Sequence, residues 1–346
     1  MLYATTRSNS HVETTYRALH LERCSDGGLF IPFRMPQIEK EQIASMKVRT
    51  FGENAAQILN IFFGCNMNGL DVDFATGRNL VQLQAIPHRI VIAEAWHCSS
   101  GKFDQVVQTL FQRICGDDAP AEITNWAKIG IRIAILFATY GALMSAEMVD
   151  VQMPLDIAVP TGDFTVPMAA WYARQMGLPL GNIICGCNAN GAVWDLIHRG
   201  ILSTNQVCVN TNTPDMDMAL PVNLERLMEA TLGKEYVHIY LDKCRMGQQL
   251  TLKPEQTELL RSGFFASVIS DSRVTSVIHN TYRTNGYVFG PYAALTYGSL
   301  LDYRAKTSES RQALLWSERS PVCDCQIVAR SMDTNEAVVI NRIRQI

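Results

Sequence analysis

The segment VPTGDFTVPMAAWYARQMGLPLGNIICGCNANGAVWDLIHRG, which runs from Val159 to Gly200, decides the fold class. It reads as the end of an apolar strand, a short turn, a helix, a second apolar strand and a second helix. Strands that alternate with helices in this way are typical of a doubly wound α/β sheet. We therefore predict that Leu155–Pro160 and Asn182–Cys187 are adjacent parallel strands at the centre of a three-layer α/β domain.

The turn TGDF between the first strand and the helix allows two interpretations. Parallel sheets build phosphate pockets where a strand passes into a helix through small residues. An ordinary tight turn has the same pattern. Asp163 favours the ordinary turn, because its carboxylate repels a phosphate and is a good cap for the free amides at a helix start. From the residues alone, the turn is predicted to be filled by Asp163 itself.

Composition and charge narrow the class of protein. The chain has 346 residues, of which 47% are hydrophobic and 18% are charged, and this suits one large or two to three modest globular domains. A net charge of −3 argues against nucleic acid as a partner. Ten cysteines accompany an opening stretch, MLYATTRSNSHVE, that lacks the apolar core of a signal peptide. We therefore expect reduced thiols and a cytoplasmic location.

The most apolar helical stretch, Asn125–Met144, is predicted to be a buried helix and not a membrane span, because Lys128 and Arg132 interrupt it. No membrane partner is expected.

Two Cys-x-Cys pairs offer thiols that could bind a metal. Structural zinc sites usually have two residues between paired cysteines, and the first pair lies in an apolar strand, so we expect no metal site. The pairs are Cys185 with Cys187 and Cys323 with Cys325.

Similarity to a known family is spread along the chain. The opening YATTRSN is followed by DGGLFIPFRMPQI, and later stretches read TFGENAAQILNIFFG, ITNWAKIGIRIAILFATY and TPDMDMALPVNLERLM. Together with the Val159–Gly200 segment, these stretches resemble threonine synthase. The resemblance implies an α/β fold that is tryptophan-synthase-β-like, the fold type II of pyridoxal-phosphate (PLP) enzymes. It further implies a threonine synthase-like N-terminal domain at 1–80, a remnant of a small α/β domain at 81–122, centred on Ile90–Ile114, and a large α/β domain at 123–346.

The resemblance implies PLP-dependent β,γ-replacement on O-phosphohomoserine, which gives threonine. The family segment HGPTLAFKD, which carries the Schiff-base lysine, has no counterpart, and this suggests a large internal deletion. A rival alignment places HCSSGKFDQ on that segment, so that Asp104 occupies the lysine position and Lys102 lies two residues away. Two residues along a helix turn a side chain by about 200°, so we expect no catalytic lysine, with Lys102 as the runner-up.

Two other family sites are altered in this chain. Glu318, in SERSPVCD, falls on the family threonine that faces the pyridine nitrogen. The family phosphate loop TGNFG corresponds to a degenerate loop of Thr161, Gly162, Asp163, Phe164 and Thr165. We therefore expect that PLP is lost and that the chain has no cofactor.

The favoured hypothesis is a non-catalytic threonine synthase-like protein that binds an unidentified small anion or a protein partner. One alternative is an active PLP lyase that acts on O-phosphohomoserine through Lys102. Another is a PLP-independent enzyme whose remodelled pocket includes Asn188, Asn190 and Tyr292. Because the loss of a packed domain exposes apolar surface, we also expect a homodimer.

Overall fold

A six-stranded sheet forms the centre of the molecule. The computed structural model describes residues 1–10, 12–77 and 80–344. The strand order is β10-β7-β6-β11-β5-β4, and all neighbours are parallel except β4 and β5. The predicted central pair is confirmed, because β6 and β7 are parallel neighbours. The strands are β4 (Gln82–Ile86), β5 (Ile90–Glu94), β6 (Leu155–Pro160), β7 (Leu180–Cys187), β10 (Phe264–Val268) and β11 (Ala313–Ser317).

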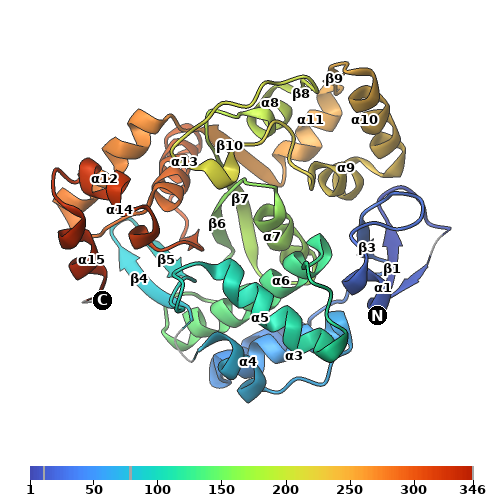
Figure 1. Ribbon diagram of the computed structural model, residues 1–346, viewed down its shortest axis with the longest axis horizontal. Coiled ribbons are helices and arrows are strands. Elements are labelled where there is room, and N and C mark those ends of the chain that lie inside the picture. The colour runs from blue at the N-terminus through green and yellow to red at the C-terminus, as the bar shows by residue number, and fades with distance from the viewer. Residues whose placement is uncertain (11, 78–79, 345–346) are drawn as a thin grey trace.

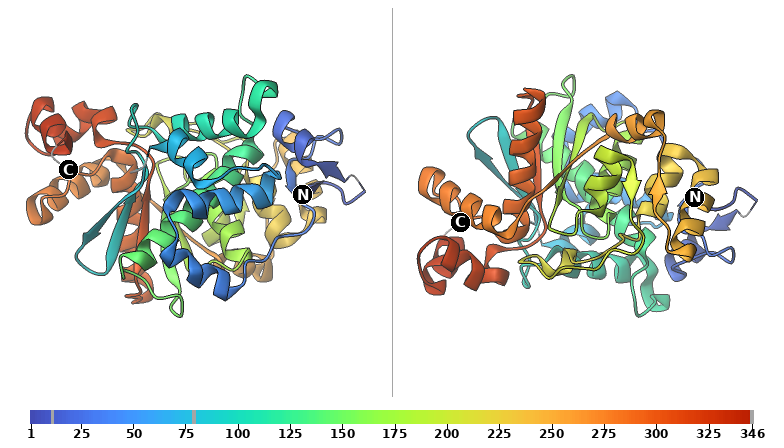
Figure 2. Two further views of the ribbon diagram at one scale, coloured as in Figure 1. Left: turned by 90° about the horizontal axis from the view of Figure 1, so that it is seen from below. Right: turned by 90° about the horizontal axis from the view of Figure 1, so that it is seen from above.

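Side chains alternate between the two faces of this sheet and so divide the core. Val159 and Trp316 belong to one hydrophobic cluster, whereas Ala158 and Leu315 belong to the other. The first cluster includes residues of α3 (Phe51–Phe63), α5 (Phe103–Cys115), α6 (Asn125–Ser145), α7 (Thr165–Gln175), α8 (Ala192–Arg199) and α9 (Leu224–Leu232). The second includes residues of α12 (Asp271–Asn285), α13 (Pro291–Thr307), α14 (Cys325–Ser331) and α15 (Glu336–Arg344). The helices thus cover both faces, as predicted, and Figures 1 and 2 show the three layers.

An N-terminal unit lies against one end of the large domain (Figure 1). Its small antiparallel sheet has the order β2-β1-β3, and the stretch DGGLFIP leads into β3. This unit continues into α3, which packs along α6. Its elements are β1 (Leu2–Thr5), β2 (Glu13–Thr14), α1 (Thr15–His20), β3 (Phe30–Pro32), α2 (Lys40–Ser45) and η1 (Met46–Val48).

The remaining elements connect the layers. They are α4 (Gly69–Thr76), η2 (Gly116–Asp118), β8 (Ile201–Leu202), η3 (Pro214–Met216), α10 (Lys234–Met246), β9 (Leu250–Thr251), α11 (Pro254–Arg261) and η4 (Pro321–Asp324). Strand β5, which falls within the predicted small-domain remnant at 81–122, pairs with β11 in the central sheet. The derivation of that stretch from a small domain stays a prediction.

Helix α6 is long and apolar enough to cross a membrane, but 89% of its most apolar window is buried inside the protein. It fills the layer between the sheet and α3, where Ile133, Phe137 and Tyr140 are almost fully buried. The predicted buried helix is therefore confirmed.

Candidate functional site

A pocket of about 480 Å³ opens where β6 and β11 end and α7 begins. Its size is within the usual range for small-molecule sites. It lies at the carboxyl ends of parallel strands, which is where open α/β sheets bind ligands. Charged groups of both signs line it: Lys102, Asp104, Lys128, Arg132, Asp163, Asp215, Glu318 and Arg319.

The turn between β6 and α7 forms one wall of this pocket, at the N-terminus of α7. Gly162 has φ +46°, and a Cβ at this position would meet no atom within 4 Å. Phe164 has φ +68°, a strained value that its buried ring maintains by packing against Phe264. The Asp163 carboxylate accepts a hydrogen bond from the Thr165 amide at 2.9 Å, so it bonds a free amide at the helix start as predicted, although Phe164 and not Asp163 is the N-cap residue of α7.

The loop also keeps hydrogen-bond donors that its own residues do not use. The Thr161 amide donates to the Gly186 carbonyl, and the Phe164 amide to the Thr161 carbonyl. Within the part of the chain that the structure describes, the amides of Gly162 and Asp163 have no hydrogen-bond acceptor. Two free amides at the N-terminus of α7 are suitable ligands for an anion.

A buried ion pair lies at the other end of the pocket. Arg132, only 5% exposed, donates to both carboxylate oxygens of Glu318, at 2.9 and 2.7 Å, and to Asp104 at 2.9 Å. The indole Nε1 of Trp316 donates to Glu318 at 2.8 Å. Burial opposes the charge of Arg132, but the two carboxylates outweigh it and raise the pKa of Arg132 above its usual value. Arg132 therefore keeps its charge, and its hydrogen bonds hold the Glu318 carboxylate in place at this end of the pocket.

Lys102 lines the pocket, although a helical rotation of about 200° was expected to turn its side chain away. It is the residue immediately before α5, and not a member of the helix, so a rotation of 100° per helical residue does not apply to it. Lys128, on α6, lines the same pocket. Among the described residues neither lysine has an ion-pair partner within 4 Å.

Asn188 and Asn190 do not contribute to this pocket. Asn188 is 2% exposed, and its side-chain amide donates to Thr211, Thr213 and Asp217 at 2.7–3.1 Å. Asn190 bonds the backbone of Val209 in both directions. Both asparagines tie the loop after β8 to the end of β7, so their prediction as pocket residues is wrong. They lie just past a strand end, but on the side that this loop covers.

Tyr292, by contrast, lines the pocket as predicted. Its hydroxyl accepts from the Asp215 amide at 3.2 Å, and the Arg319 guanidinium lies 5.3 Å from its ring centroid. Burial raises the pKa of Tyr292, so the phenol is neutral and keeps its own proton to donate.

Sequence reasoning missed Lys128, Arg132 and Asp215 as site residues. Lys128 and Arg132 were noted only as charges that interrupt an apolar helix. Their spacing of four residues places both on one helix face, and this pattern was the available signal. Asp215 comes from a loop without regular pattern, so no comparable signal existed for it.

Neither Cys-x-Cys pair forms part of a metal centre in the residues described. Cys185 and Cys187 are fully buried on one face of β7, as alternation along a strand predicts. Burial raises the pKa of the Cys187 thiol to about 12. No cluster of three or more histidine, cysteine or acidic side chains with ligand geometry occurs over residues 1–10, 12–77 and 80–344.

Comparison with known proteins gives the same family at three levels. The family model "Threonine synthase N terminus" matches residues 2–73. Threonine synthase-like 1 of Mus musculus is 30% identical over 189 residues, which is 51% of this chain and 24% of that protein. Threonine synthase of Pseudomonas aeruginosa is 29% identical over 177 residues, which is 49% of this chain and 36% of that protein. The chain thus matches well under half of the length of these curated relatives.

The fold agrees with that of solved threonine synthases. The PLP-bound threonine synthase from Brucella melitensis superimposes with a TM-score of 0.85 at 18% identity, over 96% of this chain and 91% of that one. This finding contradicts our expectation that the cofactor is lost, because the similar structure is a PLP-bound one. That expectation was wrong, because it was drawn from the alignment of a few short motifs and was then applied to the whole pocket. The internal deletion and the missing lysine stay predictions. In its N-terminal family model, in its curated relatives and in its fold, the chain is similar to threonine synthases.

Proposed function

We propose that this chain is a threonine synthase-like protein whose central pocket binds PLP or a related small phosphorylated molecule, and that it has lost the lyase reaction. The observation that carries the loss of catalysis is the Arg132–Glu318 pair. By the resemblance, Glu318 stands where the family has a threonine that faces the pyridine nitrogen. A hydroxyl can donate or accept there, whereas an ionised carboxylate can only accept.

The residues of the pocket fit the phosphate of such a ligand. The amides of Gly162 and Asp163 are free to donate, and the open space above Gly162 gives the phosphate room. Lys128 and Lys102 line the same pocket and supply positive charge, and among the described residues neither is held in an ion pair within 4 Å. Asp163 opposes binding, because its carboxylate repels the phosphate.

The ring of the ligand would lie toward Tyr292 and Glu318. PLP supplies an electron sink for carbanions when it is bound in an enzyme. In this pocket the buried guanidinium of Arg132 donates to both carboxylate oxygens of Glu318, and Tyr292 offers a neutral hydroxyl. These groups orient a ring and exclude water, but they differ from the hydroxyl that the family uses.

One observation favours a second candidate function, an active PLP lyase. Lys102 lines the pocket and has no ion-pair partner among the described residues, so its amine is available. In that case Lys102 is the catalytic lysine, and the chain acts on O-phosphohomoserine.

A titration with PLP separates the two candidates. The full-length protein is titrated by absorbance, reduced with borohydride and mapped by peptide mass spectrometry, and phosphate release from O-phosphohomoserine is measured. We expect saturable PLP binding without phosphate release. Phosphate release that disappears in Lys102→Ala, but persists in Lys47→Ala, would establish the lyase instead. Lys47 is a suitable control because it is half exposed and lies outside the pocket.

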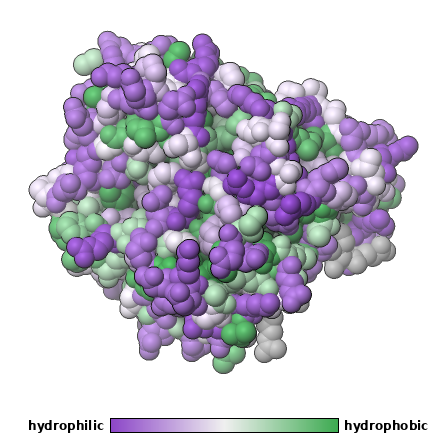
Figure 3. All heavy atoms as spheres, turned by 180° about the vertical axis from the view of Figure 1, so that it is seen from behind, coloured by the Kyte–Doolittle hydropathy of each residue, from purple (hydrophilic) through white to green (hydrophobic). Residues whose placement is uncertain are grey.

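A cytoplasmic location and a homodimer are further proposals. Exposed apolar side chains on α4 support the homodimer, since Leu70 is 72% exposed and Phe74 is 81% exposed. On the face shown in Figure 3, apolar atoms are scattered in small patches among polar ones. Light scattering at micromolar concentration tests the dimer, and a monomeric mass would refute it.

A further inference from the structure

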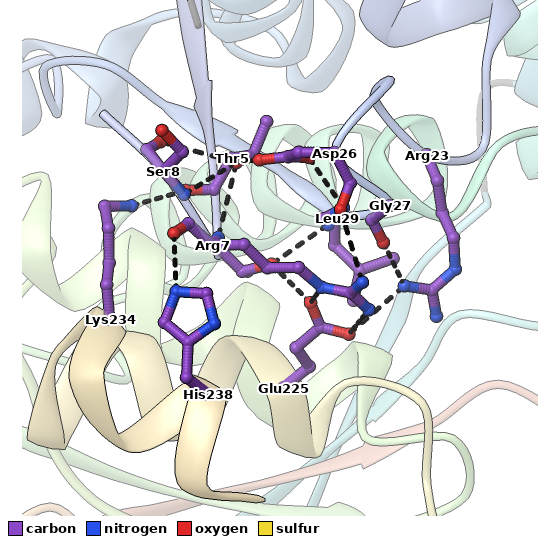
Figure 4. A network of polar contacts seen from close by, with 12 residues as sticks. Thr5, Arg7, Ser8, Arg23, Asp26, Gly27, Leu29, Glu225, Lys234 and His238 are labelled. Atoms are coloured by element: carbon purple, nitrogen blue, oxygen red, sulfur yellow. Dashed lines mark hydrogen bonds and ion pairs between the residues drawn. The ribbon is translucent and has the colours of Figure 1, made fainter. Parts of the chain in front are cut away.

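Two consecutive charged residues on α9, Glu225 and Arg226, are buried between the N-terminal unit and the large domain. Glu225 faces the N-terminal unit (Figure 4). It accepts from Arg7 at 2.9 and 3.2 Å, from Arg23 at 3.1 Å and from the Thr6 hydroxyl at 2.6 Å. These four hydrogen bonds compensate the Glu225 carboxylate for the water that it loses on burial.

Helix α10 adds two bonds to the same strand end. Lys234 donates to the Thr5 carbonyl, and a ring nitrogen of His238 lies 3.0 Å from the Arg7 carbonyl (Figure 4). The start of the N-terminal unit is therefore fixed to α9 and α10 by both charge and backbone contacts.

Arg226 bonds the N-terminal unit as well, and it also bonds two asparagines beside the pocket loop. It is fully buried, and its Nε donates to the Phe30 carbonyl on β3 at 3.0 Å. Its Nη1 donates to the side-chain oxygens of Asn125 and Asn223. One guanidinium thus joins the N-terminal sheet to α6 and to the residue that precedes α9.

Both asparagines also donate hydrogen bonds to Asp163. Asn223 donates to the Asp163 carbonyl through its backbone amide at 3.2 Å and its side-chain amide at 3.0 Å. Asn223 also donates to the Thr165 hydroxyl at 3.1 Å. Asn125 donates to the Asp163 carboxylate at 3.4 Å.

The chemistry of an amide makes Arg226 decisive for this arrangement. An asparagine side chain has one accepting oxygen and one donating nitrogen, and the two ends exchange places when the group flips. Arg226 has only donors, so it holds the oxygen of each asparagine and leaves each nitrogen to donate toward Asp163. A neutral acceptor in place of Arg226 would remove this selection.

We infer that Arg226 is a positioning residue for the pocket loop, acting through Asn125 and Asn223, and that the N-terminal unit takes part in it through Phe30. The inference rests on the proposed function insofar as the loop binds the phosphate of a ligand. The inference goes beyond the proposed function because it assigns a role to residues outside the loop. It also makes the N-terminal unit a support for the ligand site.

The test uses the full chain with two readouts, the affinity for PLP and the hydrogen exchange of the amides at 162–165. In Arg226→Gln and in Asn223→Ala we expect roughly tenfold weaker PLP binding and roughly tenfold faster exchange in this loop. The matched control is Arg174→Gln. Arg174 is a half-buried arginine that donates to the Gly181 carbonyl at 2.8 Å, at the opposite end of α7 from the loop. It should leave both readouts unchanged.

The outcomes separate the two proposals. Unchanged exchange and affinity in folded Arg226→Gln and Asn223→Ala would overturn the positioning role. If Arg226→Gln does not fold, Asn223→Ala decides alone, because it removes only a neutral side chain. If the wild-type protein binds neither PLP nor inorganic phosphate, the proposed function fails, while loop exchange still decides whether Arg226 positions the loop.

Discussion

Two buried arginines, Arg132 and Arg226, meet the cost of burial in opposite ways. Arg132 pairs with Glu318 and Asp104, and these carboxylates raise its pKa. Arg226 has only neutral oxygens as direct acceptors, and burial lowers its pKa. The first is a local ion pair beside an open pocket. The second is a shared donor at a junction of three segments.

Buried charge therefore serves two purposes in this fold. At Arg132, charge fixes the electrostatics of the pocket. At Arg226, charge fixes geometry, because a guanidinium is a rigid donor group that cannot accept a hydrogen bond.

Arg226→Met should have the largest effect on stability. It leaves the Phe30 carbonyl and two asparagine oxygens buried without this donor, and each unsatisfied group costs about 1–3 kcal/mol. The gain from removing a buried charge offsets part of this cost. We expect a loss of about 3 kcal/mol in the free energy of unfolding, measured by urea denaturation. A loss below about 1 kcal/mol would contradict a junction role.

Arg132→Met should cost less, about 2 kcal/mol, because water can reach Glu318 from the pocket once its partner is removed. The second change Glu318→Gln should recover about half of that loss, since it removes the unpaired carboxylate. The same urea measurement on single and double variants tests this. For Arg226→Met, we expect no single second substitution to recover a comparable share of the lost free energy of unfolding. Equal recovery at both sites would show that the two arginines do not differ in this way.

The junction should weaken at acidic pH through Glu225. Burial opposes its ionisation, but hydrogen bonds from Arg7 and Thr6 outweigh burial and lower the pKa of Glu225. A lowered pKa means that the stabilisation is complete above the ordinary glutamate pKa of about 4.3 and is lost as the pH falls through the folded-state value. Urea midpoints from pH 7 to pH 3 should therefore fall more steeply for wild type than for Glu225→Gln. Parallel curves would show that Glu225 is not linked to folding.

Asp163→Asn should have the smallest effect on stability, below about 1 kcal/mol, because an asparagine oxygen can still accept from the Thr165 amide. It should strengthen PLP binding by roughly tenfold, since it removes a carboxylate near the phosphate. Asp215→Asn is the matched control: it removes a carboxylate of the same pocket next to Tyr292. Equal gains in both variants would indicate a general charge effect and not a repulsion at the loop.

The fold was largely predictable from the sequence, and the site only in part. β6 and β7 are continuous apolar runs followed by helices, so pattern alone predicted their parallel pairing. The structure places Thr161, Gly162, Asp163, Thr165, Glu318 and Tyr292 around one pocket, whereas the side chain of Phe164 is buried away from it. Lys102 was discounted because a helix was assumed to include it, and the helix begins one residue later. Asn188 and Asn190 were included because they follow a strand end, but they bond the covering loop.

What the sequence by itself determined is the set of local and periodic features. These are the apolar strands, the amphipathic and buried helices, the capped turn at Asp163 and the similarity to threonine synthase, all of which depend on residues close together in the chain. Only the tertiary structure decided the partners of buried charge. Arg132 meets Glu318 across 186 positions, and Arg226 meets Phe30 across 196. Such pairs leave no periodic signal, because each depends on how separate elements pack and not on the order of residues within one element.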